Sequence, residues 1–293
     1  MSAPLLLSGK LVSEQVYSDL EPRLRRLQEH NINPGLVVIL VGDDPASQVY
    51  VRSKARRFQK LGMLSKTELL PSDTPESELI RLIDRYNRDP QFHGILVQMP
   101  VPPHINQEAV IRAIAPHKDV DGFHPENVGL LTAGNPRFIP CTPKGILRIL
   151  KQYDLSLSGK HVVIVGRSNI VGRPMSILAS LKNNTGNATT TLCHSRTANI
   201  PRFTLQADVV IAAIGKPGFV TGDFIREGAI VIDVGVNRVP DESEKGYHLS
   251  GDVEAESVGK KAGAITPVPG GVGPMTIAML VENTVESAEA YLS

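Results

Sequence analysis

The chain has few cysteines, almost no net charge and no long apolar run. Its 293 residues include two cysteines, Cys141 and Cys193, too few for a disulfide framework or a zinc cluster, so we expect thiols in a reducing cytoplasm and no metal. The formal net charge of +1 argues against partners such as nucleic acid or an acidic membrane. No stretch reaches the roughly 20 apolar residues of a membrane span, and the run in residues 3–7 is too short for a signal peptide.

The apolar residues that are present alternate between helical and strand patterns. Hydrophobic residues make up 41% of the chain and charged residues 21%, which is typical of a soluble globular protein. The length is sufficient for one large or two ordinary domains, and we favour two. In the first half the patterns predict helices at 10–29, 45–61 and 75–88 and strands at 35–44, 65–70 and 93–103. This alternation indicates a parallel sheet wrapped by helices.

A second alternation follows the Pro/Gly-rich stretch near residues 135–142, which we expect to be the boundary between domains. A helix is predicted at 146–153, strands at 161–165, 188–193, 207–215, 228–236 and 263–269, and a last helix at 275–292. We predict two α/β domains with a cleft between them: residues 1–138 plus 275–293, and a Rossmann-like dinucleotide-binding domain at 139–274. Functional residues are expected in the loops at the carboxyl ends of the strands.

The segment "HVVIVGRSNIVGRP" combines an apolar strand, a glycine-containing loop and the start of a helix near Ile170. A dinucleotide fingerprint needs glycines for a tight turn, for close approach to a pyrophosphate and for packing of helix on strand. Gly166 and Gly172 fit, whereas Ser168 replaces the middle glycine and could donate its hydroxyl to a phosphate. A tight turn without a ligand is the alternative.

The residues at the end of the strand predicted at 188–193 bear on the choice of cofactor. This strand ends in "CHSRT", with Ser195 and Arg196 but without the acid that would hold the ribose 2′-hydroxyl of NAD. Arg167 and Arg196 are both suited to a bidentate phosphate contact. The pattern therefore favours NADP, although each arginine alone could be a solvated surface charge.

A tyrosine and a lysine, Tyr50 and Lys54, lie four residues apart and share one face of the predicted helix after the first strand, together with Ser47. A Tyr-x-x-x-Lys pair also occurs in short-chain dehydrogenases, but there it follows the nucleotide loop, so that interpretation fails on chain order. Gln98 in "VQMPVPPH" and Asp121 in "KDVDGFH" follow strand ends, where packing does not explain them. Each could be structural alone; together they suggest a site.

These segments, with "YVRSK", "TPKGI", "VIDVGVN", "GDV" and "TPVPGGVGPMT", occur in an order that resembles the bifunctional methylenetetrahydrofolate dehydrogenase/methenyltetrahydrofolate cyclohydrolase family over essentially the whole chain. The resemblance implies NADP-dependent oxidation of 5,10-methylenetetrahydrofolate to the methenyl cation and hydrolysis of that cation to 10-formyltetrahydrofolate. It also implies tetrahydrofolate derivatives as ligands, a role in one-carbon metabolism and purine biosynthesis, and a homodimer built on the second domain. One departure is the longer, polar connection at residues 181–191.

The resemblance carries roles onto individual residues. Lys54 is implied to be the base for water attack, Gln98 to orient it, Tyr50 to cover the pterin ring, and Asp121 to bind the pterin amino edge. The remaining implied contacts fall into two groups. Substrate contacts are expected at Ser47, Pro269, Gly270 and Gly271, and cofactor contacts at Gly166, Arg167, Ser168, Ile170, Ser195, Arg196, Gly215 and Val236. Two alternatives remain open: an NADP-dependent oxidoreductase with another amino or keto substrate, and a non-catalytic nucleotide sensor.

Overall fold

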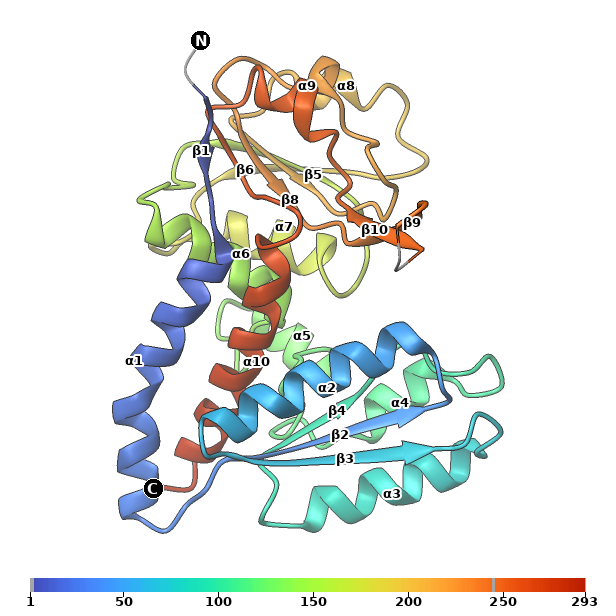
Figure 1. Cartoon of the computed structure of the whole chain (residues 1–293). Coiled ribbons are helices and arrows are strands. Elements are labelled where there is room, and N and C mark those ends of the chain that lie inside the picture. Colours follow the sequence, from blue (N-terminus) through green and yellow to red (C-terminus); the bar gives the residue numbers. More distant parts are fainter. Residues whose placement is uncertain (1–2, 244–245, 293) are drawn as a thin grey trace. The chain divides into compact units, whose positions relative to one another are not determined.

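The structure is a computed structural model that describes residues 3–243 and 246–292 (Figure 1). The chain folds into two units, which are described separately. One unit comprises the residues up to Gln15 and Thr142–Thr276; the other comprises Val16–Cys141 and the residues from Ile277 onward. The expected first domain contained all of residues 1–138. The difference arises because β1 (Leu5–Leu6) pairs with β11 (Ala264–Ile265), an interaction too short to show in a periodicity.

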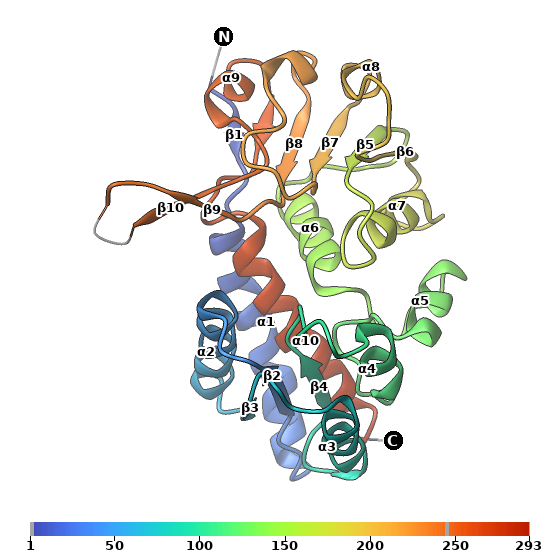
Figure 2. The same ribbon diagram turned by 90° about the vertical axis from the view of Figure 1, so that its right-hand side faces the viewer.

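The unit containing Thr142–Thr276, here called the dinucleotide unit, has a six-stranded parallel sheet in the order β1-β11-β8-β7-β5-β6. Figure 2 shows β8, β7, β5 and β6 side by side. Its other strands are β5 (His161–Val165), β6 (Thr189–Cys193), β7 (Val209–Ala212) and β8 (Ile230–Asp233). Strand β5 has β6 on one side and β7 on the other, so the connections leave in opposite directions there, which is where dinucleotides bind in such sheets.

Short helices and one hairpin complete the dinucleotide unit. The helices are α6 (Cys141–Gln152), α7 (Gly172–Ser180), α8 (Pro201–Thr204), α9 (Ala255–Gly259) and the 3-10 helix η1 (Gly222–Phe224). The antiparallel hairpin of β9 (Asn237–Pro240) and β10 (Tyr247–Ser250) projects from the sheet (Figure 2). Valines of the central strands pack against Ile225 and Val258, which gives this unit its own core.

The other unit, here called the lysine unit, has a three-stranded parallel sheet in the order β3-β2-β4. Strand β2 (Gly35–Val41) is buried at every position, and β3 (Leu64–Leu70) and β4 (Gly94–Val97) flank it. Helix α2 (Pro45–Lys60) covers one face and α3 (Glu76–Arg88) the other (Figures 1 and 2). On the α3 face the core joins Val37, Ile39, Leu79 and Ile83, and the alternating side chains of β2 point to the α2 face.

Four further helices contribute to the lysine unit: α4 (Gln107–Ala113), α5 (Pro125–Thr132), and parts of α1 (Gly9–Glu29) and α10 (Val272–Glu289). Ser287 of α10 donates a hydrogen bond to the His93 carbonyl at 2.7 Å, and Arg23 of α1 forms an ion pair with Glu289 of α10. In the described part of the chain, no helix is both long and apolar enough to cross a membrane.

The predicted α/β class with parallel sheets and two domains is confirmed. The patterned helices and strands are present, but two strands end earlier than expected. Strand β4 ends at Val97 instead of near residue 103, and β11 ends at Ile265 instead of near residue 269, because the prolines that follow cannot donate to a sheet. One correction concerns α7, which begins at Gly172 rather than near Ile170 because the backbone N–H of Val171 bonds to Ser168 Oγ and closes a turn first. Another concerns α6, which begins at Cys141, five residues before the expected Ile146.

Candidate active site

Helix α2 begins at the carboxyl end of β2 and carries three of the predicted site residues. The carboxylate of Asp44 accepts a hydrogen bond from the Ser47 backbone N–H at 2.7 Å, and Pro45 occupies the first turn, so the start of the helix is well defined. Ser47, Tyr50 and Lys54 follow at intervals of three and four residues and share one side of the helix. Ser47 and Lys54 are buried, whereas Tyr50 is 42% exposed.

Gln98 directly follows β4 and contacts the lysine. The Lys54 ammonium or amine nitrogen, Nζ, donates a hydrogen bond to Gln98 Oε1 at 3.0 Å. Gln98 is itself held at both ends, since its backbone N–H bonds to the Ile39 carbonyl at 2.8 Å and its side-chain amide donates to the Met99 carbonyl at 3.0 Å. The amide oxygen therefore faces Lys54 and cannot turn away without breaking another bond.

The carboxylate of Asp121 completes this group from the turn that follows Val120. Burial raises the pKa of Asp121, while the nearby Lys54 charge and a hydrogen bond from the Cys141 thiol oppose that rise. Cys141 is 3% exposed, and its sulfur lies 3.6 Å from the Val120 carbonyl oxygen. The buried Lys54 and Cys141 and the partly buried Gln98 and Asp121 thus form one cluster at the strand ends of the lysine unit.

The surroundings of Lys54 favour its neutral form. Only 8% of the residue is exposed, and this desolvation is the main reason that its pKa is lowered. The charge of the Asp121 carboxylate acts in the opposite direction. A neutral amine that donates one N–H to Gln98 keeps a lone pair available. The cluster can therefore supply a base from a residue that would be fully charged in water.

Asp119 supports the turn that carries Asp121. It is 2% exposed, and its carboxylate accepts hydrogen bonds from the His124 backbone N–H at 2.7 Å and from Asn127 Nδ2 at 2.8 Å. Burial raises the pKa of Asp119 to about 7, although both hydrogen bonds favour the ionised form. Asn127 is in turn hydrogen-bonded by Arg137 at 2.9 Å.

In the dinucleotide unit, the loop after β5 has the close backbone approaches that its glycines were predicted to allow. A Cβ on Gly166 would lie 2.0 Å from the Ala213 carbonyl oxygen, and one on Gly172 would lie 1.9 Å from the Gly166 carbonyl oxygen. The second contact packs the start of α7 on the strand end. Both positions therefore require glycine.

The other predicted cofactor residues lie in loops that follow neighbouring strands of the same sheet. Ser195 and Arg196 follow β6, Gly215 follows β7, and Val236 follows β8. Arg167, Ser168 and Arg196 are exposed, as a phosphate ligand requires, and the apolar side chains of Ile170 and Val236 are 47% and 41% exposed. With its acceptor bonded to Val171, the Ser168 hydroxyl still has its hydrogen to donate. These residues suit the phosphates and flat rings of a dinucleotide.

The loop after β11 is shaped largely by packing within the dinucleotide unit. The Val268–Pro269 bond is cis and Gly270 has a positive φ of 104°. A Cβ on Gly271 would lie 2.4 Å from the Pro267 carbonyl oxygen. Gly271 is therefore required by backbone packing, and the exposed Pro269 and the turn at Gly270 are better placed for a ligand.

Comparisons with known protein families decide the identity. Residues 7–121 match the model of the tetrahydrofolate dehydrogenase/cyclohydrolase catalytic domain, and residues 140–292 match that of the NAD(P)-binding domain of the same family. The chain belongs to the tetrahydrofolate dehydrogenase/cyclohydrolase family. The bifunctional protein FolD of Chlorobium phaeobacteroides is 54% identical over 286 residues, which are 96% of each chain.

Solved structures of family members agree. The bifunctional FolD enzyme of Campylobacter jejuni has a TM-score of 0.93 and 47% identity, covering 99% of this chain and 100% of that one. The Trypanosoma brucei enzyme, solved with NADP and an inhibitor, has a TM-score of 0.94 and 36% identity, covering 100% and 99%. The predicted family and the predicted enzyme class, a bifunctional dehydrogenase and cyclohydrolase with an NAD(P)-binding domain, are confirmed.

Sequence reasoning about this tetrahydrofolate dehydrogenase/cyclohydrolase missed residues that the structure places at the sites. Cys141 was expected only to be a reduced thiol, and Asp119 was not considered. A usable signal existed for Asp119, because it shares the "KDVDG" turn with Asp121. None existed for Cys141, whose contact with Asp121 joins positions 20 residues apart. Within the described residues, no cluster of His, Cys, Asp and Glu could hold a metal ion.

Proposed function

We propose that this enzyme oxidises 5,10-methylenetetrahydrofolate with NADP and hydrolyses the resulting methenyl cation to 10-formyltetrahydrofolate. The observation that carries the proposal is the buried Lys54, whose amine is hydrogen-bonded to Gln98 and lies in the field of Asp121. Hydride acceptance is the chemistry that NADP supplies when it is bound. The protein's own residues bind and orient the reactants and handle protons.

In the hydrolytic step, water adds to the bridging carbon of the methenyl cation. Lys54 in its neutral form accepts one proton from this water, which leaves a hydroxyl group on the carbon. The bond from the carbon to N5 then breaks as the hydroxyl proton is transferred to N5, which leaves the formyl group on N10, and the lysine later releases its proton to solvent. Repulsion by the cation adds to desolvation in keeping the lysine uncharged until it acts. Gln98 directs the amine by accepting one of its N–H groups.

We assign the remaining substrate contacts by their chemistry. Asp121 accepts hydrogen bonds from the donor-rich amino edge of the pterin, and the half-exposed ring of Tyr50 covers the pterin and helps to position the water. Ser47 is buried on the same side of α2. Pro269, Gly270 and Gly271 supply backbone contacts to the substrate.

The cofactor assignment follows from the strand-end loops of the dinucleotide unit. Gly166, Ser168 and the start of α7 take the pyrophosphate, while the exposed Arg167 and Arg196 favour a 2′-phosphate. Ile170, Ser195, Gly215 and Val236 line the rest of the site. The turn after β6 is closed by a hydrogen bond from the Arg196 backbone N–H to His194 Nδ1 and carries no acid against the 2′-position. We therefore expect NADP to be preferred over NAD.

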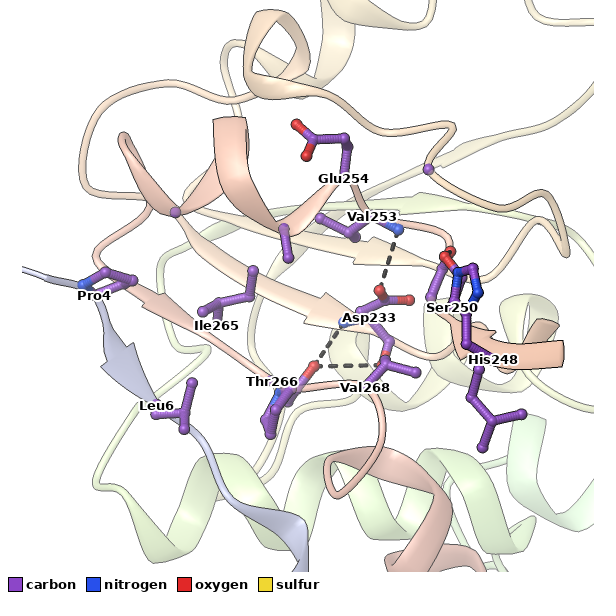
Figure 3. Close-up of a pocket in the computed structure, with 16 residues that line it drawn as sticks. Pro4, Leu6, Asp233, His248, Ser250, Val253, Glu254, Ile265, Thr266 and Val268 are labelled. Atoms are coloured by element: carbon purple, nitrogen blue, oxygen red, sulfur yellow. Dashed lines mark hydrogen bonds between the residues drawn. The ribbon is translucent and has the colours of Figure 1, made fainter. Parts of the chain in front are cut away.

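The wider setting of the enzyme is also part of the proposal. We infer a role in one-carbon metabolism and purine biosynthesis in the cytoplasm, where the buried thiols Cys141 and Cys193 stay reduced. We infer a homodimer built on the dinucleotide unit. Leu249 of its projecting hairpin and Leu6 of β1 are exposed, and both line a cavity of about 580 Å³. Figure 3 shows this cavity and labels Leu6. Sedimentation of the wild type against Leu249→Arg tests the dimer.

The deciding experiment is an ultraviolet-visible assay with methylenetetrahydrofolate, run with NADP and with NAD in parallel. We expect NADP to be reduced with a higher kcat/KM than NAD, and methenyltetrahydrofolate supplied directly to be consumed without cofactor. Absence of NADP reduction would refute the dehydrogenase assignment. Persistence of the methenyl absorbance at the uncatalysed rate would refute the cyclohydrolase assignment.

A further inference from the structure

Two buried aspartates of the dinucleotide unit have no role in the chemistry assigned so far. Asp233 ends β8 and is 4% exposed, and Asp252 follows β10 and is completely buried. Burying a carboxylate is unfavourable unless hydrogen bonds replace its water. The partners of these two groups show what they hold in place.

Asp252 accepts three hydrogen bonds from two different loops. Its Oδ2 accepts from the backbone N–H groups of Ile214 at 2.7 Å and Gly215 at 2.8 Å, both in the loop after β7. Its Oδ1 accepts from Asn237 Nδ2 at 2.9 Å, at the end of the loop after β8. One carboxylate thus ties together the loops that contain Gly215 and Val236.

Asp233 in turn fixes Asp252. Its Oδ1 accepts from the backbone N–H groups of Gly235 and Asp252, each at 2.9 Å, and its Oδ2 accepts from the Val253 N–H at 3.1 Å. Its own backbone N–H donates to Thr266 Oγ1 at 2.8 Å, which links it to the end of β11 (Figure 3). Burial raises the pKa of Asp233 to about 6, and the neighbouring Asp252 charge adds to that rise, against the three N–H bonds.

Two glycines beside these carboxylates have no space for a side chain. A Cβ on Gly251 would lie 1.7 Å from Asp233 Oδ2, and a Cβ on Gly235 would lie 2.3 Å from Asp252 Oδ1. Both glycines are therefore part of the same arrangement. A larger residue at either position would displace a carboxylate from its amide partners.

The loop that Asp252 holds lies directly against the glycine loop after β5. A Cβ on Gly166 would lie 2.0 Å from the Ala213 carbonyl oxygen and 3.3 Å from the Ile214 nitrogen. Gly215 has a positive φ of 72° and is exposed. A small shift of Ile214 and Gly215 would therefore alter the surface offered to a dinucleotide.

We propose that Asp252, with Asp233 behind it, is a positioning residue for the NADP site: it fixes the loop after β7 against the glycine loop and joins it to the loop after β8. This inference rests on the proposed function, because NADP is the ligand that these loops are assigned to bind. Neither carboxylate needs to touch the cofactor. Asp252 acts through the backbone of Ile214 and Gly215.

The test compares Asp252→Ala, Asp252→Asn and the control Asp223→Asn, which removes an exposed carboxylate of η1 in the same unit. Because Asp252→Ala removes the acceptor that holds the Ile214 and Gly215 amides, it should raise the KM and the Kd for NADP by roughly 10-fold to 100-fold, which corresponds to about 1.4–2.7 kcal/mol of binding free energy. Asp252→Asn keeps one oxygen for the two amides and should raise both by about 3-fold. The control should behave as the wild type.

The hydrolytic activity serves as an internal control for misfolding of the variants. Hydrolysis of methenyltetrahydrofolate needs no NADP, so its kcat and KM should stay unchanged in both Asp252 variants. In ligand-free protein, hydrogen exchange at the Ile214 and Gly215 amides should be faster in Asp252→Ala than in the control. Parallel loss of both activities would indicate a purely structural role and would overturn the inference.

The remaining outcomes separate this inference from the proposed function. A wild-type KM and Kd for NADP in Asp252→Ala would refute the positioning role while the dehydrogenase assignment stands. If Asp252→Ala does not fold, an unchanged Kd in Asp252→Asn refutes it instead. If the wild type shows no turnover with methylenetetrahydrofolate, the proposed function fails, and NADP titration calorimetry on the same variants still decides the positioning role.

Discussion

The amine of Lys54 is the group on which the hydrolytic half of the proposed reaction depends. We expect Lys54→Met to lower kcat for methenyltetrahydrofolate hydrolysis by about 100-fold to 10,000-fold, because methionine fills similar space but cannot accept a proton. The loss of methenyl absorbance measures this rate. Lys60→Met, an exposed position on the same helix, is the matched control and should keep wild-type activity. Hydrolysis near the wild-type rate in Lys54→Met would show that another group is the base.

The pH dependence of the hydrolysis should report the electrostatic coupling between Lys54 and Asp121. Only the neutral amine acts as a base, so kcat should rise with pH through the lowered pKa of Lys54. The Asp121 carboxylate raises that pKa, in opposition to burial. We therefore expect Asp121→Asn to move the midpoint of the kcat profile to lower pH. This shift is independent of any change in the maximal kcat.

The control for this shift is Asp84→Asn, which removes an exposed carboxylate paired with Arg88 on α3. Its midpoint should coincide with that of the wild type. A midpoint of Asp121→Asn that stays in place, or moves to higher pH, would mean that Lys54 is not the titrating group.

The role of a single residue could be predicted from the sequence where a local motif assigns a function to its position. Gly166 and Gly172 were interpretable because a fingerprint assigns each glycine a steric task, and the structure shows the backbone contacts that require them. Cys141 and Asp252 were not, because Cys141 lies 20 residues from Asp121, and Asp252 lies 15 to 38 residues from the groups that its side chain contacts. Periodicity contains no information about such pairs. The same limit applies to Lys54 and Tyr50, which share a helix face but differ greatly in exposure.

At the scale of elements, α10 holds the turn that carries Asp121. Asn283 is completely buried, and its Nδ2 donates hydrogen bonds to the Val120 carbonyl at 2.7 Å and to the Ile139 carbonyl at 3.0 Å. We expect Asn283→Ala to lower the free energy of unfolding by about 1–3 kcal/mol, because two buried carbonyl groups lose a donor. It should also raise the folate KM of both activities. Urea unfolding and steady-state kinetics measure the two effects.

A matched variant exists on the same helix. Glu286→Gln changes a half-exposed side chain one turn beyond Asn283 and should leave the folate KM unchanged. If Asn283→Ala destabilised the protein but kept a wild-type folate KM, α10 would stabilise the unit without positioning Asp121.

The elements missed by the sequence reasoning are those with little periodicity of their own. Strand β1 has two residues and exists through its pairing with β11. The hairpin of β9 and β10 has no fully buried position on either strand, so its sequence lacks the apolar face that marks a strand packed on a core. Helices α4 and α5 have only seven and eight residues, but Asn106 and His124 cap them with side-chain acceptors. Attention to the N-cap residue Asn106 and to Pro125 in the first helical turn would have located both.

At the scale of the whole molecule, the sequence predicted the two parallel sheets because a fully buried strand has a distinctive apolar run. It could not predict which polar groups those sheets bury. Beside β4, Lys118 is 2% exposed and donates hydrogen bonds to the carbonyls of Tyr86 at 2.9 Å and Asp89 at 2.7 Å. The neighbouring His93 is 4% exposed. Because burial shifts the pKa values of titratable groups such as Lys118 and His93, the free energy of unfolding depends on pH.

His93 should contribute to that dependence with a definite sign. Burial, reinforced by the charge of Lys118, lowers its pKa to about 4, against about 6.5 in the unfolded chain. Between these values the unfolded chain binds the extra proton, so the stability due to His93 is complete above about pH 6.5 and is lost as the pH falls towards 4. The slope is about 1.4 kcal/mol per pH unit, or at most about 3.4 kcal/mol in all.

His93→Asn isolates this contribution, because the asparagine Oδ1 can replace Nδ1 as the acceptor for the Gly35 backbone N–H, which lies 3.1 Å away. We expect the wild type to lose more stability than His93→Asn when urea unfolding is repeated from about pH 8 to about pH 4, with the divergence confined to the range below about pH 6.5. His30→Asn, an exposed histidine on the turn after α1, should follow the wild type. A stability difference between wild type and His93→Asn that is independent of pH would show that His93 titrates normally in the folded protein.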